Sequence, residues 1–75
     1  MNKAKRKKIE GICSLLETIN QQILDIETEE QDAFDNLSEG LQATDMGQTM
    51  EEAIDLLDSA SEYVSQAIDE LGGIL

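Results

Sequence analysis

Apolar residues recur along the N-terminal half of the chain at alternating steps of three and four. Residues at this spacing lie on one side of an α-helix and form the contact stripe of a coiled coil. The pattern predicts a long amphipathic helix over about residues 3–37. Its expected contact stripe, which serves packing within a hairpin or between copies of the chain, is Ile9, Ile12, Leu16, Ile19, Ile23 and Ile26.

This stripe is wider than a contact between two helices requires, because further apolar residues lie beside it. Cys13, Leu15 and Leu24 are those neighbours, and the extra width favours a helical bundle. Asn20 and Glu27 fall inside the widened stripe. Each of these polar side chains needs a hydrogen-bonding partner or a position at a solvated edge.

The C-terminal part repeats the spacing and predicts a second helix over about residues 45–71. Thr44 or Asp45 is the expected start, and the Gly72-Gly73 pair is a typical helix end. Alanine recurs every seven residues, which lets a neighbouring helix approach closely. The expected contact stripe is Met46, Met50, Ala53, Leu57, Ala60, Val64, Ala67 and Leu71.

The segment Gln31–Thr49 between the two patterns decides the architecture. It contains Gly40 and Gly47 and the helix-stopping run 36–38, so we place a turn at about residues 38–44. A turn gives an antiparallel hairpin of two long helices, whereas an uninterrupted helix would give a rod. The chain has no Pro and only two aromatic residues. We therefore expect a single all-α domain, an antiparallel helical hairpin that associates into a bundle.

Charge is strongly segregated along the chain. There are 17 acidic and five basic residues, and all five basic residues lie within Lys3–Lys8. An antiparallel hairpin is expected to place them beside Asp69 and Glu70, where the two sets would offset each other's unfavourable helix-dipole interactions. A net charge of −12 suits a protein partner with a basic or hydrophobic surface, and direct binding to nucleic acid or to a membrane is not expected.

The chain lacks the residues that most catalytic and metal sites use. It has no His, and its one cysteine, Cys13, cannot form an internal disulfide and is expected to be a packed thiol. The acidic run 25–32 has no calcium-loop order and continues the helical period, so a solvated face is expected. The sequence contains no phosphate-binding loop and no long apolar run, so neither a membrane span nor secretion through a signal peptide is expected. We predict a cytoplasmic protein that is not an enzyme and has no cofactor or metal.

Glu30 occupies a position on the contact stripe with no base nearby in the sequence. Either the helices splay there, or a partner supplies a cation. In an antiparallel dimer of hairpins, Lys3–Lys8 of one subunit would lie near residues 31–49 of the other. This end of the hairpin is therefore the predicted partner-binding region, with Glu30, Phe34, Leu37, Leu41, Met46 and Met50 as its candidate residues.

The same region carries a resemblance. Glu29–Gln42, followed by Gly47 and Met50–Asp55, resembles small acidic proteins encoded by phages and prophages of Gram-positive bacteria. Those proteins begin with a basic segment, as Asn2–Lys8 does here, but usually carry Pro in place of Ser38 and a basic residue in place of Met46. The resemblance implies a helical hairpin, the cytoplasm of a bacterial host and a viral context. It implies no defined activity.

Three functions fit these observations. The first is a homo-oligomeric, non-catalytic protein–protein interaction module, expected to be a phage-encoded inhibitor or modulator of a host protein such as a defence protein. The second is a DNA mimic that occupies a nucleic-acid-binding groove, and its binding should weaken steeply with salt. The third is a structural or assembly protein. The acidic face that mimicry would use is Glu51, Asp55, Asp58, Glu62 and Asp69.

Overall fold

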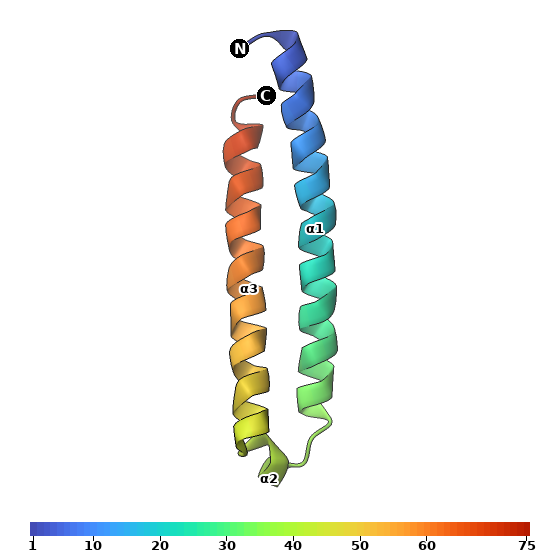
Figure 1. Cartoon of the computed structure of the whole chain (residues 1–75), viewed down its shortest axis with the longest axis vertical. Coiled ribbons are helices and arrows are strands. Elements are labelled where there is room, and N and C mark those ends of the chain that lie inside the picture. The colour runs from blue at the N-terminus through green and yellow to red at the C-terminus, as the bar shows by residue number, and fades with distance from the viewer.

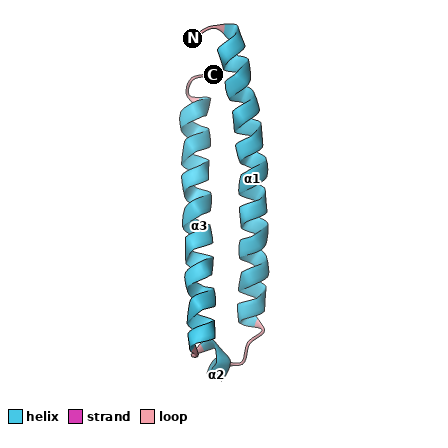
Figure 2. Cartoon of the chain, viewed as in Figure 1, coloured by secondary structure: helices cyan, strands magenta, loops and turns pink.

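The computed structural model describes all 75 residues as two long antiparallel helices (Figure 1). Helix α1 spans Lys3–Asp35, the short helix α2 spans Glu39–Gln42, and α3 spans Asp45–Gly72. There are no strands (Figure 2). The molecule measures 58 × 14 × 12 Å. The predicted all-α hairpin is confirmed, and the alternative of one continuous helix is wrong.

Each helix begins at a residue whose side-chain oxygen accepts a backbone N–H of the first turn. Asn2 accepts from Lys5 at 2.8 Å, Ser38 from Leu41 at 3.3 Å, and Thr44 from Gly47 at 3.4 Å. These bonds satisfy donors that have no partner within the helix. The start predicted at Thr44 or Asp45 is therefore confirmed.

We expect Thr44→Ala to destabilise the hairpin by about 1 kcal/mol, because the first turn of α3 loses its cap. Thr44→Ser retains a hydroxyl and should stay close to the wild type. Thermal unfolding followed by circular dichroism measures both variants. An unchanged midpoint in Thr44→Ala would show that the cap contributes nothing to stability.

The connection differs from the simple turn expected at residues 38–44. Helix α1 ends at Asp35, two residues before the predicted end, and α2 lies inside the connection. Gln42 ties α2 to α1, since its side-chain amide donates to the Phe34 carbonyl at 3.1 Å. The connection is therefore hydrogen-bonded to the end of α1.

The contact stripe on α1 is not the one predicted. Ile12 and Ile19 are each 46% exposed, and Ile26 is also exposed. The apolar spacing alone could not decide which stripe of α1 contacts α3. Ile9, Leu16 and Ile23 belong equally to the predicted stripe and to one that steps by four and then by three. In the structure the residues at this alternative spacing are half-buried and form the contact stripe of α1: Ile9, Cys13, Leu16, Asn20, Ile23, Glu27, Glu30, Phe34 and Leu37.

On α3 the predicted stripe is largely confirmed, except that Met46 is exposed. The half-buried residues are Met50, Ala53, Ile54, Leu57, Ala60, Val64, Ala67, Ile68 and Leu71. Only two residues of the chain, Gly47 and Ser61, are fully buried, and no apolar side chain is. Two helices alone thus form a contact stripe without an enclosed core.

Candidate interaction surface

Each long helix carries a second apolar stripe beside the contact stripe. On α1 it consists of Ile12, Leu15, Ile19 and Ile26. On α3 it consists of the exposed Leu56 and Tyr63 together with Ala53, Ala60 and Ala67, which are half-buried at the edge of the contact stripe. Leu15 is 65% exposed, and Leu56 and Tyr63 are each 70% exposed. These nine residues are called the apolar face below.

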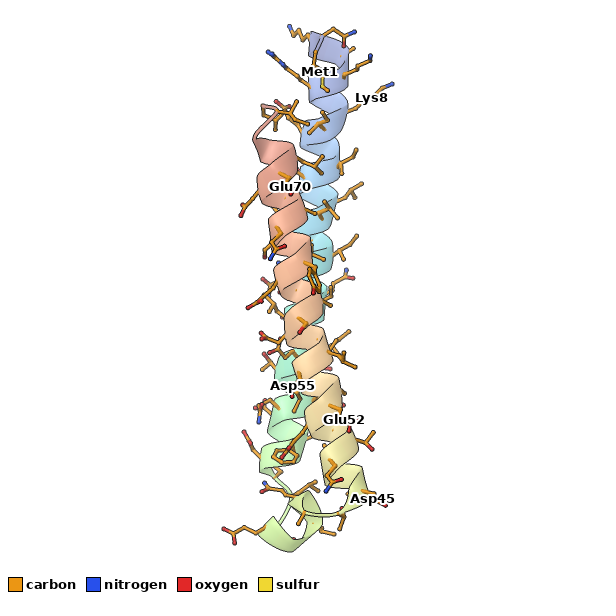
Figure 3. The ribbon with its side chains drawn as sticks, turned by 90° about the vertical axis from the view of Figure 1, so that its left-hand side faces the viewer. Met1, Lys8, Asp45, Glu52, Asp55 and Glu70 are labelled. Carbon is orange, nitrogen blue, oxygen red and sulfur yellow. The ribbon has the colours of Figure 1, made fainter.

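The two second stripes lie on the same side of the hairpin. Every member of these stripes directly precedes a buried or half-buried residue of its helix, as Ile19 precedes Asn20 on α1 and Ala60 precedes Ser61 on α3. In an antiparallel helix pair, the residues that directly precede contact residues lie on the same side of the pair in both helices. Figure 3 agrees, since along the upper two thirds of the hairpin mostly carbon-only side chains line the right-hand edge and oxygen-tipped side chains the left-hand edge.

A polar cluster within the contact stripe sets how the helices are aligned. The Asn20 side chain accepts from the Ser61 hydroxyl at 2.7 Å and donates to the Ser65 hydroxyl at 3.1 Å. Along the hairpin axis, Asn20 therefore lies midway between Ser61 and Ser65. It follows that residue n of α1 is level with about residue 83 − n of α3. The partner that the sequence required for Asn20 is found.

This alignment leaves the first two turns of α1 extending beyond α3, as Figure 1 shows. Residues 3–8, called the basic overhang below, carry all five basic side chains, and all are exposed. Asp69 is level with about Ser14, which is about 9 Å along the axis from Lys8. The expected alignment of Lys3–Lys8 beside Asp69 and Glu70 is therefore wrong.

The acidic face proposed for mimicry lies away from the apolar face. Glu51, Asp55, Asp58, Glu62 and Asp69 are all exposed. Glu51 and Asp58 follow the contact residues Met50 and Leu57 directly, which places them on the flank opposite Ala53 and Ala60. The hairpin is thus two-sided, with an apolar face and an acidic face.

The six candidate residues predicted at the turn end are not displayed as one surface. Glu30, Phe34, Leu37 and Met50 are half-buried in the contact between the helices, whereas Leu41 and Met46 are exposed. The exposed apolar residues Leu15, Leu56 and Tyr63 are not among the partner-binding residues that the sequence predicted. Their signal in the sequence was a second three-and-four spacing next to the first.

The acidic end of the contact stripe contains an unpaired polar group. One carboxylate oxygen of Glu27, Oε2, is shielded from solvent and has no hydrogen-bonding partner. The sequence required a partner or a solvated edge for this side chain, and Oε2 has neither. A shielded oxygen without a partner reduces stability, so Glu27 is a weak point in the contact between the helices.

The structure offers little for small-molecule chemistry. No three His, Cys, Asp or Glu side chains converge as a metal site. One hollow occurs, lined by Lys3, Arg6, Lys7, Glu10 and Leu75. Ligand sites for small molecules are lined predominantly by apolar and aromatic side chains, whereas four of the five residues that line this hollow are charged. None of the helices combines the length and apolar character that crossing a membrane requires.

No protein family, curated protein or solved structure matches this chain. The apolar face is therefore interpreted from its own residues.

Proposed function

We propose that this protein is a non-catalytic protein–protein interaction module that binds through its apolar face. The observation that supports the proposal is the alignment of Leu15, Leu56 and Tyr63, each at least 65% exposed, on one side of the hairpin. Contiguous exposed apolar surface is typical of interaction sites. Burying a side chain of this size contributes about 1.5–3 kcal/mol, and Tyr is frequent among residues that dominate binding energy.

The role as a phage-encoded inhibitor or modulator of a host protein is a narrower form of this proposal. It is supported only by the resemblance of residues 29–55 to small acidic phage proteins. A structural or assembly role would use the same face. The proposal therefore concerns the binding surface first and the biological setting second.

DNA mimicry is the second candidate, supported by the fully exposed acidic face. Five carboxylates cover the stretch from Glu51 to Asp69, which is about 27 Å of helix at about 1.5 Å per residue. One DNA strand carries a charge about every 3.4 Å. The acidic face thus has a lower charge density than a single strand, which makes the apolar face the stronger candidate.

A capture experiment separates the two candidates. The tagged chain is used as bait in a lysate of the cells that encode it. The lysate also contains an untagged copy of the same chain. Leu56→Asp combined with Tyr63→Asp should abolish retention of the partner, and high salt should leave wild-type retention largely intact. Both substituted side chains are 70% exposed, so the helix contact is not altered, and circular dichroism verifies the fold.

The matched control neutralises the other side with Asp55→Asn, Asp58→Asn and Glu62→Gln. This variant should retain the partner. Loss of the partner in the control, or upon addition of salt or competing DNA, would contradict the proposal and favour mimicry.

A further inference from the structure

We infer that the apolar face is covered by a second copy of this chain, which lies antiparallel to the first and completes a four-helix bundle. This inference rests on the proposed function, because it names the partner of the same face. It is supported by the exposed area, by the position of the face along the hairpin and by the charges at the two ends.

The exposed area fits a dimer. The hairpin exposes 5512 Å², whereas a folded monomer of 8.3 kDa typically exposes about 4,600 Å². The excess is about 900 Å², and a stable protein–protein interface removes about 800 Å² from each partner. Covering one long face would therefore bring the chain close to the surface area of an ordinary folded protein.

The position of the face defines where a two-fold axis would pass. The large exposed side chains extend from the level of Ile12 to that of Leu56, which is level with about residue 27 of α1. Their centre lies at about the level of residue 20. Ile19 and Tyr63 are both near this level. Each would therefore lie close to the same residues of the second copy, at the centre of the interface.

A two-fold axis at that level brings opposite charges together. It places the basic overhang of one copy beside about residues 32–37 of the other. Asp32, Asp35 and Glu39 lie at that end, as does Asp45 at the start of α3, and all four are exposed. The overhang has no acidic residue of its own before Glu10.

The antiparallel orientation follows from these charges. A parallel dimer would set five basic side chains against five others and one acidic turn end against another, which is repulsive at both ends. The alanines at positions 53, 60 and 67 favour the same packing. As small residues within the apolar face, they allow a helix of the second copy to approach closely.

Sedimentation equilibrium tests the stoichiometry. The wild-type chain should have twice its monomer mass of 8.3 kDa, and Ile19→Asp with Tyr63→Asp should reduce this to the monomer mass. Leu24→Asp is the matched control, since Leu24 is 38% exposed and lies on the opposite flank of α1. The control should remain a dimer.

A charge exchange keeps the test valid if the central variant fails to fold. Lys5→Glu with Lys8→Glu alters only exposed side chains and should weaken dimerisation about tenfold at low salt. Adding Asp32→Lys and Asp35→Lys to the same chain should restore it. Failure of this restoration would overturn the antiparallel arrangement.

Orientation can be measured directly by spin labels. Gly40→Cys, in a Cys13→Ser chain, places one label at each turn end. Gly40 is exposed, and a Cβ there meets no atom within 4 Å. The antiparallel dimer predicts labels about 50 Å apart. Labels that lie close together would indicate a parallel dimer and contradict the inference.

Failure of this inference differs from failure of the proposed function. A wild-type chain that stays monomeric throughout the micromolar range would overturn self-association. If that monomer binds an apolar fluorescent dye, and Leu56→Asp abolishes the signal, the apolar face remains available to a different protein. Absence of both dimer and dye binding would overturn the proposed function as well.

Discussion

Gly47→Ala is expected to destabilise the hairpin by about 2–3 kcal/mol. A Cβ at this position would overlap the Gln42 carbonyl oxygen and would lie 2.6 Å from its carbonyl carbon and 2.7 Å from its Cα. These are backbone atoms, so no side-chain rotation can relieve the overlap. Gln42 itself is tied to the end of α1 through the Phe34 carbonyl. Moving α2 away would therefore break that bond.

Gly11→Ala is the matched control for this substitution. Gly11 lies within α1, and a Cβ there would meet no atom within 4 Å. Because alanine favours helix and restricts the unfolded chain, this variant should be more stable than the wild type by about 1 kcal/mol. The two Gly→Ala changes thus have opposite predicted signs.

Urea unfolding followed by circular dichroism measures both variants. All samples need the same protein concentration, because self-association makes stability depend on concentration. Equal effects at Gly47 and Gly11 would show that α2 does not pack closely against the start of α3. A loss confined to Gly47→Ala would establish that contact.

The helices could be predicted because their signals are local. Apolar spacing, the helix start at Thr44, and the glycine pair 72–73 each act within a few residues along the chain. The choice between two overlapping stripes on α1 depended instead on α3. Asn20 faces inward because Ser61 and Ser65 provide its hydrogen bonds, and Ile19 is consequently turned toward the apolar face.

The turn shows the same limit. Gly40 and Gly47 looked equivalent in the sequence, yet Gly40 has open space beside it and Gly47 contacts the backbone of Gln42. Gln42 gave no signal in the sequence, because its bond to the Phe34 carbonyl joins residues eight positions apart across a turn. Non-local contacts of this kind cannot be inferred from spacing.

The proposed interaction surface differs from the site predicted at the turn end for a related reason. Density of unusual residues drew the prediction to the turn end, where Phe34 and Leu37 are in fact half-buried between the helices. Leu56 and Tyr63 attracted less weight because each lies beside a contact stripe that already explained its helix. Only the packed hairpin shows that this stripe leaves them 70% exposed.

Asn20→Ala is the second substitution with a large expected effect, a loss of about 1–3 kcal/mol. Ser61 is only 6% exposed, and its hydroxyl donates to the Asn20 side chain at 2.7 Å. Without Asn20 this shielded hydroxyl loses its acceptor, and the Ser65 hydroxyl loses a donor. An unsatisfied shielded group costs more than the net value of the bond that it made.

Replacing both partners should reverse the sign. Asn20→Leu with Ser61→Ala removes the polar pair and continues the apolar stripe, so the double variant should equal or exceed the wild type in urea unfolding. A double variant less stable than the wild type would show that the hydrogen bonds contribute net stability.

The polar pair then needs another reason to be present, and specificity supplies one. A polar residue within a coiled-coil stripe restricts alignment and oligomeric state at a cost in stability. The double variant should accordingly adopt more than one alignment of α1 and α3, although it is at least as stable as the wild type. Its amide NMR spectrum should contain more than one signal for residues flanking positions 20 and 61, where the wild type gives a single set. A single set in the double variant would mean that the turn alone, with Gly47 packed against Gln42, fixes how α1 and α3 align.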